Sequence, residues 1–351
     1  LPFSNRIRAP YLASLESQKK WSTILEFQTQ EPSGEKYQCI YYRAHYEQGN
    51  HELAYKGAKQ LWLSGNGIDD SCDPLFSAWD KAGLRSDELI LDRLLLAFEQ
   101  RNGKLMNYLL KQLDSDKAAK QGKEMKALFS KPEGVASFAK KHKVNEFYQK
   151  QTELAFQKLA RKDTTAAQKA FDKVIEGQKF SQEKTQQLAD YLAFRLINTD
   201  SEEMMAWRDQ AIETSSKQVL LERRARLAIQ HADWAGLQHW ISKLDDKHQS
   251  SIRWQYWRGR AELASGQETV GTKRLTDILG QRNFYSVAAA KQLNEPVRYK
   301  TSSLTYNSQV VKPFETALVR IDELITRDKI AAAKSEWRWL LANSSKEQKS
   351  M

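Results

Sequence analysis

Cys39 and Cys72 are the only thiols in the 351-residue sequence, and they lie 33 residues apart. That separation is about the length of one helix-hairpin repeat. Because one repeat along a solenoid returns the chain to nearly the same place, the two sulfur atoms could meet at a helix junction and form a disulfide. The spacing fits equally well two buried, reduced thiols, as in a cytosolic protein.

The remaining polar residues do not complete a known catalytic or metal-binding motif. His51 and Glu52 begin like the zinc motif HExxH, but Tyr55 stands where the second histidine is required. Acidic pairs such as Asp69–Asp70 and Glu202–Glu203 are common on helix surfaces and at helix starts. We therefore predict no metal, no cofactor and no catalytic residue in this chain.

The ten tryptophans could stack against sugar rings or bases. Trp254, Tyr256 and Trp257 lie within one predicted helix, where aromatic side chains more often belong to the core. These three are retained as candidate contacts to a glycan.

The net charge of +11 favours an anionic partner such as nucleic acid, lipid headgroups or an acidic cell-wall polymer. Lys and Arg are nevertheless interleaved with Asp and Glu along the whole chain, and the densest basic groups, 140–143 and 222–226, are short. This pattern favours solvated helix faces over a dedicated polyanion groove. We predict no nucleic-acid partner, and no apolar run is long enough to span a membrane.

The elements that would carry these residues are helices. Proline is absent from 133–295, and strong helix formers dominate that span. Residues 37–63 and 254–279 each predict two helices around a glycine, Gly49 or Gly266. With these glycines aligned, the paired residues are Tyr37 and Trp254, Ile40 and Trp257, Ala44 and Ala261, Leu53 and Val270, and Leu61 and Ile278.

This pattern resembles the tetratricopeptide repeat, with an alanine that lets the second helix pack closely and a glycine that ends the first helix. Looser hairpins are predicted to turn near Asp163 and near Ala232–Asp233. The apolar face after the second turn consists of Trp234, Leu237, Trp240, Ile241 and Leu244. Since one hairpin cannot bury its apolar face alone, we predict an all-α fold, a ring-like α-superhelix of short helical hairpins.

The character of the chain changes after Pro296. Residues 297–312 lack helical periodicity and indicate a linker. We predict a superhelical domain over 1–296 and the first helices of a second domain over 313–351, which is too short to fold alone.

Five segments carry a resemblance to a known family. In order they are 39–79 (beginning CIYYRAHYEQGN), 207–212 (WRDQAI), 220–229 (LLERRARLAI), 253–263 (RWQYWRGRAEL) and 282–293 (RNFYSVAAAKQL). Each motif is weak alone, but the ordered set, with both cysteines, resembles the large soluble lytic murein transglycosylases of Gram-negative bacteria over most of 10–350.

The resemblance implies a ring-like superhelix followed by a linker domain and a lysozyme-like catalytic domain. It also implies the periplasm as the compartment and a Cys39–Cys72 disulfide. The family cleaves the β-1,4 bond between N-acetylmuramic acid and N-acetylglucosamine without water and leaves a 1,6-anhydromuramoyl end. One glutamic acid acts there first as general acid and then as base.

The catalytic signature of that family is missing. Its glutamate belongs to a Glu-Ser pair followed by a Gly-Leu-Met-Gln segment, and this sequence has no such segment. The only Glu-Ser pair, Glu16–Ser17, lies near the wrong end of the chain. We therefore expect a truncated form that lacks the first helices of the ring and the C-terminal catalytic domain, and that is inactive alone.

The expected partners are glycan strands of peptidoglycan and the missing catalytic domain. Two other interpretations stay open at this point. A tetratricopeptide-like scaffold would hold a peptide on its concave face and have no affinity for sugars. A nucleic-acid binder would need basic residues and stacking aromatics gathered on one face.

Overall fold

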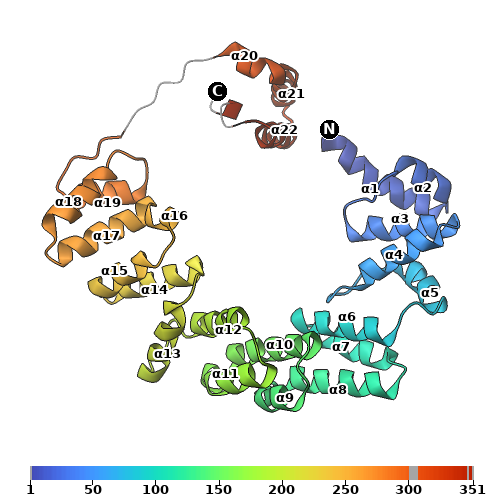
Figure 1. The fold of residues 1–351 in the computed structure, drawn as a ribbon. Helices are drawn as coiled ribbons and strands as arrows, with labels where there is room; N and C mark the ends of the chain where they lie inside the picture. The colour runs from blue at the N-terminus through green and yellow to red at the C-terminus, as the bar shows by residue number, and fades with distance from the viewer. Residues whose placement is uncertain (1, 300–306, 346–347, 350–351) are drawn as a thin grey trace. The chain divides into compact units, whose positions relative to one another are not determined.

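A computed structural model describes residues 2–299, 307–345 and 348–349. Its regular elements are all helices, and no strand occurs in these ranges (Figure 1). The chain divides into two compact units. The first comprises 1–62, 68–85 and 301–351, and the second comprises 63–67 and 86–300. The all-α prediction is confirmed.

The N-terminal part of the first unit is a set of short helices. They are α1 (Pro2–Ser17), α2 (Trp21–Phe27), α3 (Glu35–Glu47), α4 (His51–Trp62), η1 (Asp70–Cys72) and α5 (Asp73–Lys81). Buried apolar residues of α1, α2 and α3 form one core, namely Leu12, Leu15, Trp21, Ile24, Ile40 and Ala44. This core brings α3, which carries Cys39, against α1.

The C-terminal part of the first unit is a helix pair with its own core. Its elements are α20 (Ser308–Val311), η4 (Lys312–Phe314), α21 (Glu315–Thr326) and α22 (Ile330–Ala342). Ala317 and Ile321 of α21 pack against Ala333 and Leu340 of α22. The predicted linker, 297–312, therefore contains the short helix α20, while its residues 300–306 lie outside the described residues. The domain boundaries themselves stay a prediction.

The second unit is a succession of helical hairpins. Its elements are α6 (Asp87–Glu99), α7 (Gly103–Leu109), η2 (Leu110–Gln112), α8 (Asp116–Ser130), η3 (Pro132–Gly134), α9 (Val135–Lys141), α10 (Glu146–Lys162), α11 (Thr164–Gln178), α12 (Gln182–Arg195), α13 (Glu202–Glu213), α14 (Gln218–Gln230), α15 (Trp234–Ser242), α16 (Asp246–Gln249), α17 (Ile252–Ala264), α18 (Glu268–Asp277) and α19 (Phe284–Gln292).

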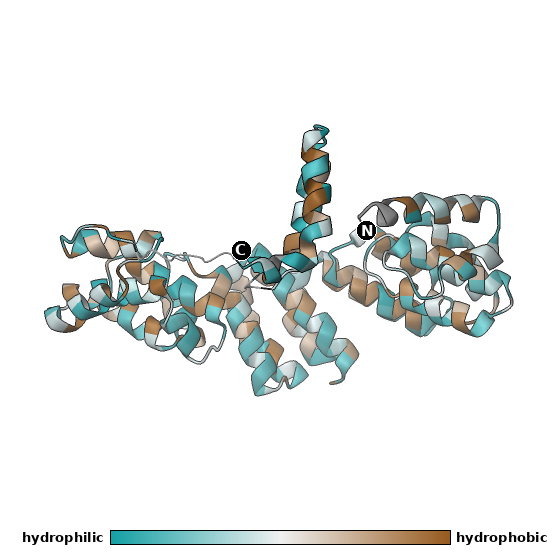
Figure 2. Ribbon diagram, turned by 90° about the horizontal axis from the view of Figure 1, so that it is seen from above, coloured by the Kyte–Doolittle hydropathy of each residue, from teal (hydrophilic) through white to brown (hydrophobic). Residues whose placement is uncertain are grey.

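Each hairpin packs on the next, as α10 does on α12 and α15 on α17. Polar and apolar residues share the same helices in Figure 2, as expected of amphipathic helices that bury one face. This stacking of hairpins is the α-superhelix that the sequence predicts.

The predicted turns lie where the sequence places them. Gly49 and Gly266 have φ of +82° and +76°, in the left-handed region that glycine adopts without strain. Asp163 precedes α11, and its side chain accepts a hydrogen bond from the Ala166 amide at 2.8 Å. Asp233 caps α15 in the same way, at 2.8 Å from the Gly236 amide. Such caps satisfy amides that a helix leaves unpaired at its start.

The alignment of the two glycine-centred hairpins is correct for the first helices and fails in part for the second. Ala44 and Ala261 are fully buried, as predicted. Val270, which the alignment places on the packing face of α18, is 50% exposed. Gly271 makes the close approach instead, because a Cβ there would lie 2.9 Å from the carbonyl oxygen of Gly259 in α17.

Candidate functional site

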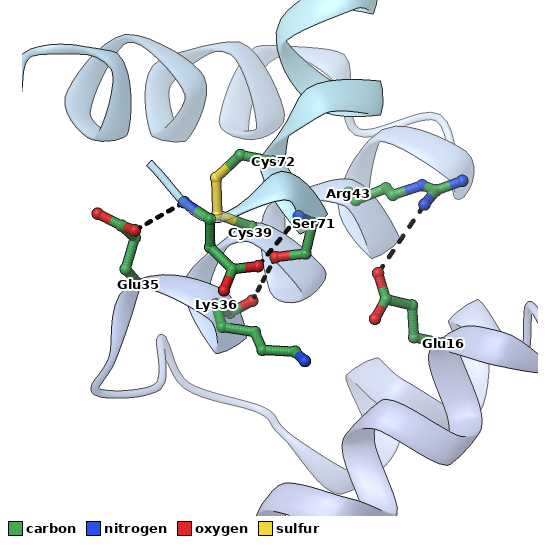
Figure 3. Close-up of a disulfide and its surroundings, with 8 residues drawn as sticks. Glu16, Glu35, Lys36, Cys39, Arg43, Ser71 and Cys72 are labelled. Carbon is green, nitrogen blue, oxygen red and sulfur yellow. Dashed lines mark hydrogen bonds and ion pairs between the residues drawn. A yellow bond between two sulfur atoms is a disulfide. The ribbon is translucent and has the colours of Figure 1, made fainter. Parts of the chain in front are cut away.

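Cys39 and Cys72 form a disulfide that joins α3 to η1, and both residues are fully buried (Figure 3). Their Cα atoms are 4.8 Å apart. The joint is reinforced by hydrogen bonds on either side. Glu35 Oε1 accepts from the Asp69 amide at 2.9 Å, and the Asp69 side chain accepts from the Ser71 amide at 3.0 Å. The cysteines therefore staple one hairpin to the following junction, and neither is a reactive thiol.

Glu16, of the only Glu-Ser pair, lies near this joint and faces Arg43, with 3.9 Å between the charged atoms (Figure 3). Burial raises the pKa of the Glu16 carboxyl, and the attraction of Arg43 only partly opposes that rise. Arg43 also lies over the ring of Trp21, 4.8 Å from its centroid. These contacts tie α1 to α2 and α3, so Glu16 has a structural role here.

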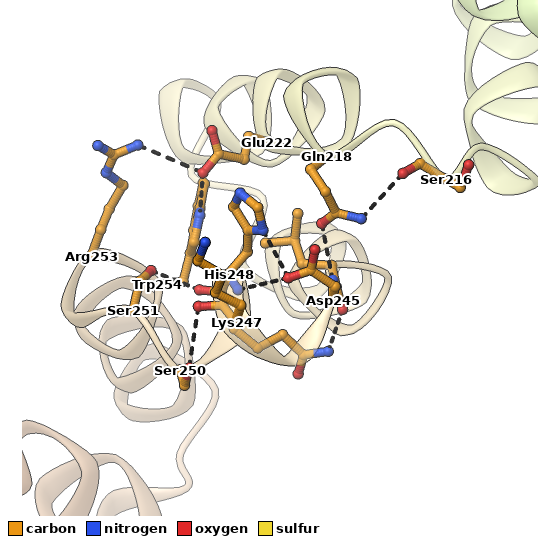
Figure 4. Close-up of polar contacts among 12 residues, drawn as sticks. Ser216, Gln218, Glu222, Asp245, Lys247, His248, Ser250, Ser251, Arg253 and Trp254 are labelled. Atoms are coloured by element: carbon orange, nitrogen blue, oxygen red, sulfur yellow. Dashed lines mark hydrogen bonds and ion pairs between the residues drawn. The ribbon is translucent and has the colours of Figure 1, made fainter.

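The aromatic cluster of α17 is mostly core. Trp254 is fully buried, and its indole N–H donates to Glu222 of α14 at 2.8 Å (Figure 4). Tyr256 is 5% exposed. Neither side chain offers a ring face to a ligand, because the neighbouring hairpins cover both, so their assignment as glycan contacts is not kept. Trp257 is half-buried between two core clusters, and a glycan contact at Trp257 stays a prediction.

Asp245, His248, Ser250 and Ser251 bring together the residue types of a catalytic triad (Figure 4). Asp245 Oδ1 accepts from the His248 amide at 2.8 Å and lies 2.7 Å from His248 Nδ1. The backbone N–H of His248, and then its side chain, lower the pKa of Asp245. Both serine hydroxyls donate to backbone carbonyls, Ser251 to that of His248 at 2.6 Å. The group caps the short helix α16, and no hydroxyl is held for attack on a substrate.

A charged cluster that sequence reasoning missed lies between α13 and α14. Asp209 accepts from Arg208 Nε at 2.8 Å and from both Arg224 Nε and an Arg224 terminal nitrogen, at 2.8 and 3.0 Å. Arg208 is 2% exposed and also donates to the Ile197 carbonyl at 3.0 Å. Burial would raise the pKa of Asp209, but the hydrogen bonds and charges of the two arginines outweigh it and lower that pKa.

Both arginines also line a recess of about 560 Å³. Its other polar lining residues include Asp200 and Asp233, so opposite charges balance across it. The cluster therefore fixes the packing of two hairpins and does not form an anion site.

No metal-binding group is found in the described part of the chain, where histidine, cysteine and carboxylate side chains do not gather in threes. Within the same residues, none of the helices combines the length and apolar character needed to cross a membrane.

Comparisons with known proteins place these features in a family. Residues 312–351 match the family model for the soluble lytic murein transglycosylase L domain. A model for the Cucumovirus coat protein matches 50–121, but the relatives and structures described below do not include a coat protein. The soluble lytic murein transglycosylases of Escherichia coli K12 and Salmonella typhimurium are 29% and 30% identical to this chain over 99% of its length. The chain spans 54% of the length of each.

Solved structures give the same result. The 70-kDa soluble lytic transglycosylase in complex with bulgecin A superposes with a TM-score of 0.84 at 29% identity, covering 99% of this chain and 56% of that one. The 1.65 Å structure of the Escherichia coli enzyme gives 0.83 at 29% identity, with the same coverage. A lytic transglycosylase from Pseudomonas aeruginosa, at 22% identity and a TM-score of 0.75, shows the shared fold.

Proposed function

Because this chain belongs to the soluble lytic murein transglycosylases, of whose length it spans about half, we propose that it is the non-catalytic superhelical scaffold of such an enzyme. The observation that carries this proposal is the relationship itself, which extends over 99% of the chain at 29–30% identity. The likeness of fold supports it independently, with a TM-score of 0.84.

The reaction proposed for the whole protein is cleavage of the bond between N-acetylmuramic acid and N-acetylglucosamine, with formation of a 1,6-anhydromuramoyl end. This chain would not perform that step. The carboxyl groups of Glu16, Asp209 and Asp245 are held by arginines or backbone amides of the fold. We propose that the catalytic glutamate belongs to a C-terminal domain outside this sequence, and that the chain alone is inactive.

We propose further that the scaffold binds and orients glycan strands in the periplasm. Peptidoglycan carries carboxylates on its peptides, and a chain of net charge +11 attracts them most strongly at low ionic strength. The Cys39–Cys72 disulfide supports an oxidising compartment, since disulfides are rare in the reducing cytosol.

The test is a pulldown with purified sacculi across a salt series. We expect the chain to sediment with sacculi at low salt and to be released as the salt concentration rises. A basic protein of unrelated fold and similar net charge is the control for adsorption. No binding at any salt concentration, or binding no stronger than that of the control, would overturn the glycan-binding role.

Binding of a peptide library to the same chain tests the alternative function, a scaffold that holds a peptide. Tight binding of a peptide together with failure to bind sacculi would favour a tetratricopeptide-like interaction protein. Release of anhydromuramoyl products by this chain alone would contradict the proposed inactivity.

A further inference from the structure

Two kinds of side-chain contact occur among the cations of the second unit. One group is bound to carboxylates, as Lys150 is to Glu99 at 2.8 Å and Arg274 to Glu262 at 2.8 Å. The other group lies against aromatic side chains and has no ion pair among the residues that the structure describes. Arg260 and Arg282 belong to this group. Five further members lie on the neighbouring helices α8, α10, α12 and α14, namely Lys126, Lys158, Arg161, Arg195 and Arg223.

The first of these contacts between cations and aromatic side chains lie where α8 meets α10. The ammonium nitrogens of Lys126 and Lys158 lie 4.8 and 3.4 Å from the ring centroid of Phe129. Lys158 also donates to the Phe129 carbonyl at 2.6 Å. Burial lowers the pKa of Lys158, and the nearby charges of Lys126, Arg161 and Lys162 lower it further, while Glu133, which is paired with Lys162, partly opposes this shift. Positive charge is therefore concentrated at this junction.

The next contacts join α10 to α12. Arg161 donates to the Tyr191 hydroxyl at 2.6 Å, and Arg195 donates to the same hydroxyl at 3.3 Å. The guanidinium of Arg195 lies 5.2 Å from the Tyr191 ring centroid. Two guanidinium groups thus meet on one neutral hydroxyl, and no carboxylate is paired with either.

The last contact joins α12 to α14. The guanidinium of Arg223 lies over the Phe194 ring, 4.2 Å from its centroid. Arg223 is exposed, and its guanidinium has no hydrogen bond to another described residue. The next residue back, Glu222, is already bound by the Trp254 indole and by Arg226, at 2.8 and 2.9 Å, and so does not neutralise Arg223.

These contacts define a cation–aromatic row across consecutive first helices of the hairpins, α8, α10, α12 and α14 (Figure 1). Its residues are Lys126, Phe129, Lys158, Arg161, Tyr191, Phe194, Arg195 and Arg223. The cations cover the aromatic faces, so the rings do not form a stacking platform for sugars or bases. Stacking holds the guanidinium groups in place and leaves N–H groups at their edges to donate to an anion.

We propose that the cation–aromatic row binds the peptide carboxylates of a peptidoglycan strand that lies across the first helices of successive hairpins. This inference rests on the proposed function and adds to it which chemical groups of the strand are recognised and which residues recognise them. Charge complementarity carries it, because five cations without an acidic partner face a polymer whose carboxylates recur along its length. The sugar rings would then contribute little to the affinity of this surface.

The test compares two triple variants that remove the same charge. The first is Lys158→Gln, Arg161→Gln and Arg223→Gln, within the row. The matched control is Lys169→Gln, Lys173→Gln and Lys273→Gln, at exposed positions on the second helices α11 and α18. Binding is measured at low salt to soluble uncrosslinked peptidoglycan strands, either untreated or with their carboxyl groups converted to amides.

We expect the row variant to bind untreated strands about tenfold more weakly than the parent chain, and the control variant to change by less than about twofold. Amidation of the strands should weaken the parent chain to about the level of the row variant. The single change Arg223→Gln guards against a loss of binding through misfolding, because this side chain is exposed and its guanidinium stacks on Phe194 without an ion pair among the described residues. It should weaken binding about two- to threefold with an unchanged melting temperature.

An equal loss of affinity in the two triple variants would overturn the proposal, because binding would then depend on net charge alone. The sacculus test of the proposed function could still succeed in that case. Unchanged binding to amidated strands would also overturn it. Row-dependent binding of a single-stranded oligonucleotide, as tight as that of the peptidoglycan strand, would replace carboxylate recognition by general polyanion binding. Failure of the parent chain to bind sacculi would instead reject the proposed function itself.

Discussion

Single residues with reactive side chains are used here to hold the fold together. The triad-like group of Asp245, His248 and two serines is a helix cap, and Glu222 holds the Trp254 indole. Where the pKa of a carboxyl is shifted, the cause is a neighbour within the same fold or burial by it, as at Asp209 and Glu16. This use of polar groups is consistent with a scaffold role.

Asp209 offers a direct test at this scale. Asp209→Asn should lower the free energy of unfolding at pH 7 by about 3 kcal/mol, because buried Arg208 loses its counter-ion. The pKa of Asp209 is lowered in the folded state, so its contribution is fully present above the unfolded pKa, about 3.9. That contribution is lost as the pH falls through the lower folded pKa.

Urea unfolding of the parent chain and the variant between pH 7 and pH 3 measures this effect. The difference between their unfolding free energies should shrink toward the acid end. Asp172→Asn, at an exposed position of α11, is the control and should change stability by less than about 0.5 kcal/mol. A difference that stays constant with pH would contradict the assigned role of Asp209.

At the scale of elements, the hairpins depend on how closely their two helices approach. In α17 and α18 the contact is made by Gly259 and Gly271, where a Cβ on Gly271 would lie 2.8 Å from Leu263 Cγ and 2.9 Å from the Gly259 carbonyl oxygen. The carbonyl belongs to the backbone and cannot move aside as a flexible side chain could. The spacing of the helices in this hairpin is therefore set by Gly271.

Gly271→Ala should lower the free energy of unfolding by about 1–3 kcal/mol, since overpacking outweighs the higher helix propensity of alanine. Thr269→Ala, on the exposed face of the same helix, should be within about 0.5 kcal/mol of the parent chain. Thermal unfolding of the three proteins provides the comparison. Stabilisation by Gly271→Ala would show that the two helices can separate without loss.

At the scale of the whole molecule, the two compact units differ in the interactions that hold their helices together. The first contains the only disulfide, Cys39–Cys72, and the second is held by stacked hairpins without a covalent link. In a solenoid each hairpin contacts mainly its neighbours, so a local change in stability does not spread evenly along the chain. The disulfide should therefore stabilise the first unit selectively.

We expect Cys39→Ala with Cys72→Ala to lower the stability of the first unit by about 3–4 kcal/mol, from the entropy of the 33-residue loop that the disulfide closes. Amide hydrogen exchange should accelerate in α3 and α4 and stay unchanged in α14 and α17. The parent chain treated with reductant should behave like the double variant. Equal acceleration in both sets of helices would contradict independent units.

The sequence by itself determined the local structure of this protein. The turns at Gly49, Gly266 and Asp163 follow from backbone preference and capping, which act over a few residues, and they are confirmed. The buried face of α15 follows from helical periodicity, and Leu237, Trp240, Ile241 and Leu244 are in the core as predicted. The spacing of the cysteines allowed a disulfide without requiring one, and the family resemblance supplied the pairing.

Only the tertiary structure decided which faces are covered. Periodicity places Trp254 and Tyr256 on a helix face, but the neighbouring hairpins determine that no ligand can reach their rings. The contacts of buried Arg208 and half-buried Asp209 depend on side chains that successive hairpins bring together. The same is true of the cation–aromatic row from Lys158 to Arg223. Contacts between residues about 30 positions apart cannot be recognised from the local sequence pattern, because the packing between hairpins creates them.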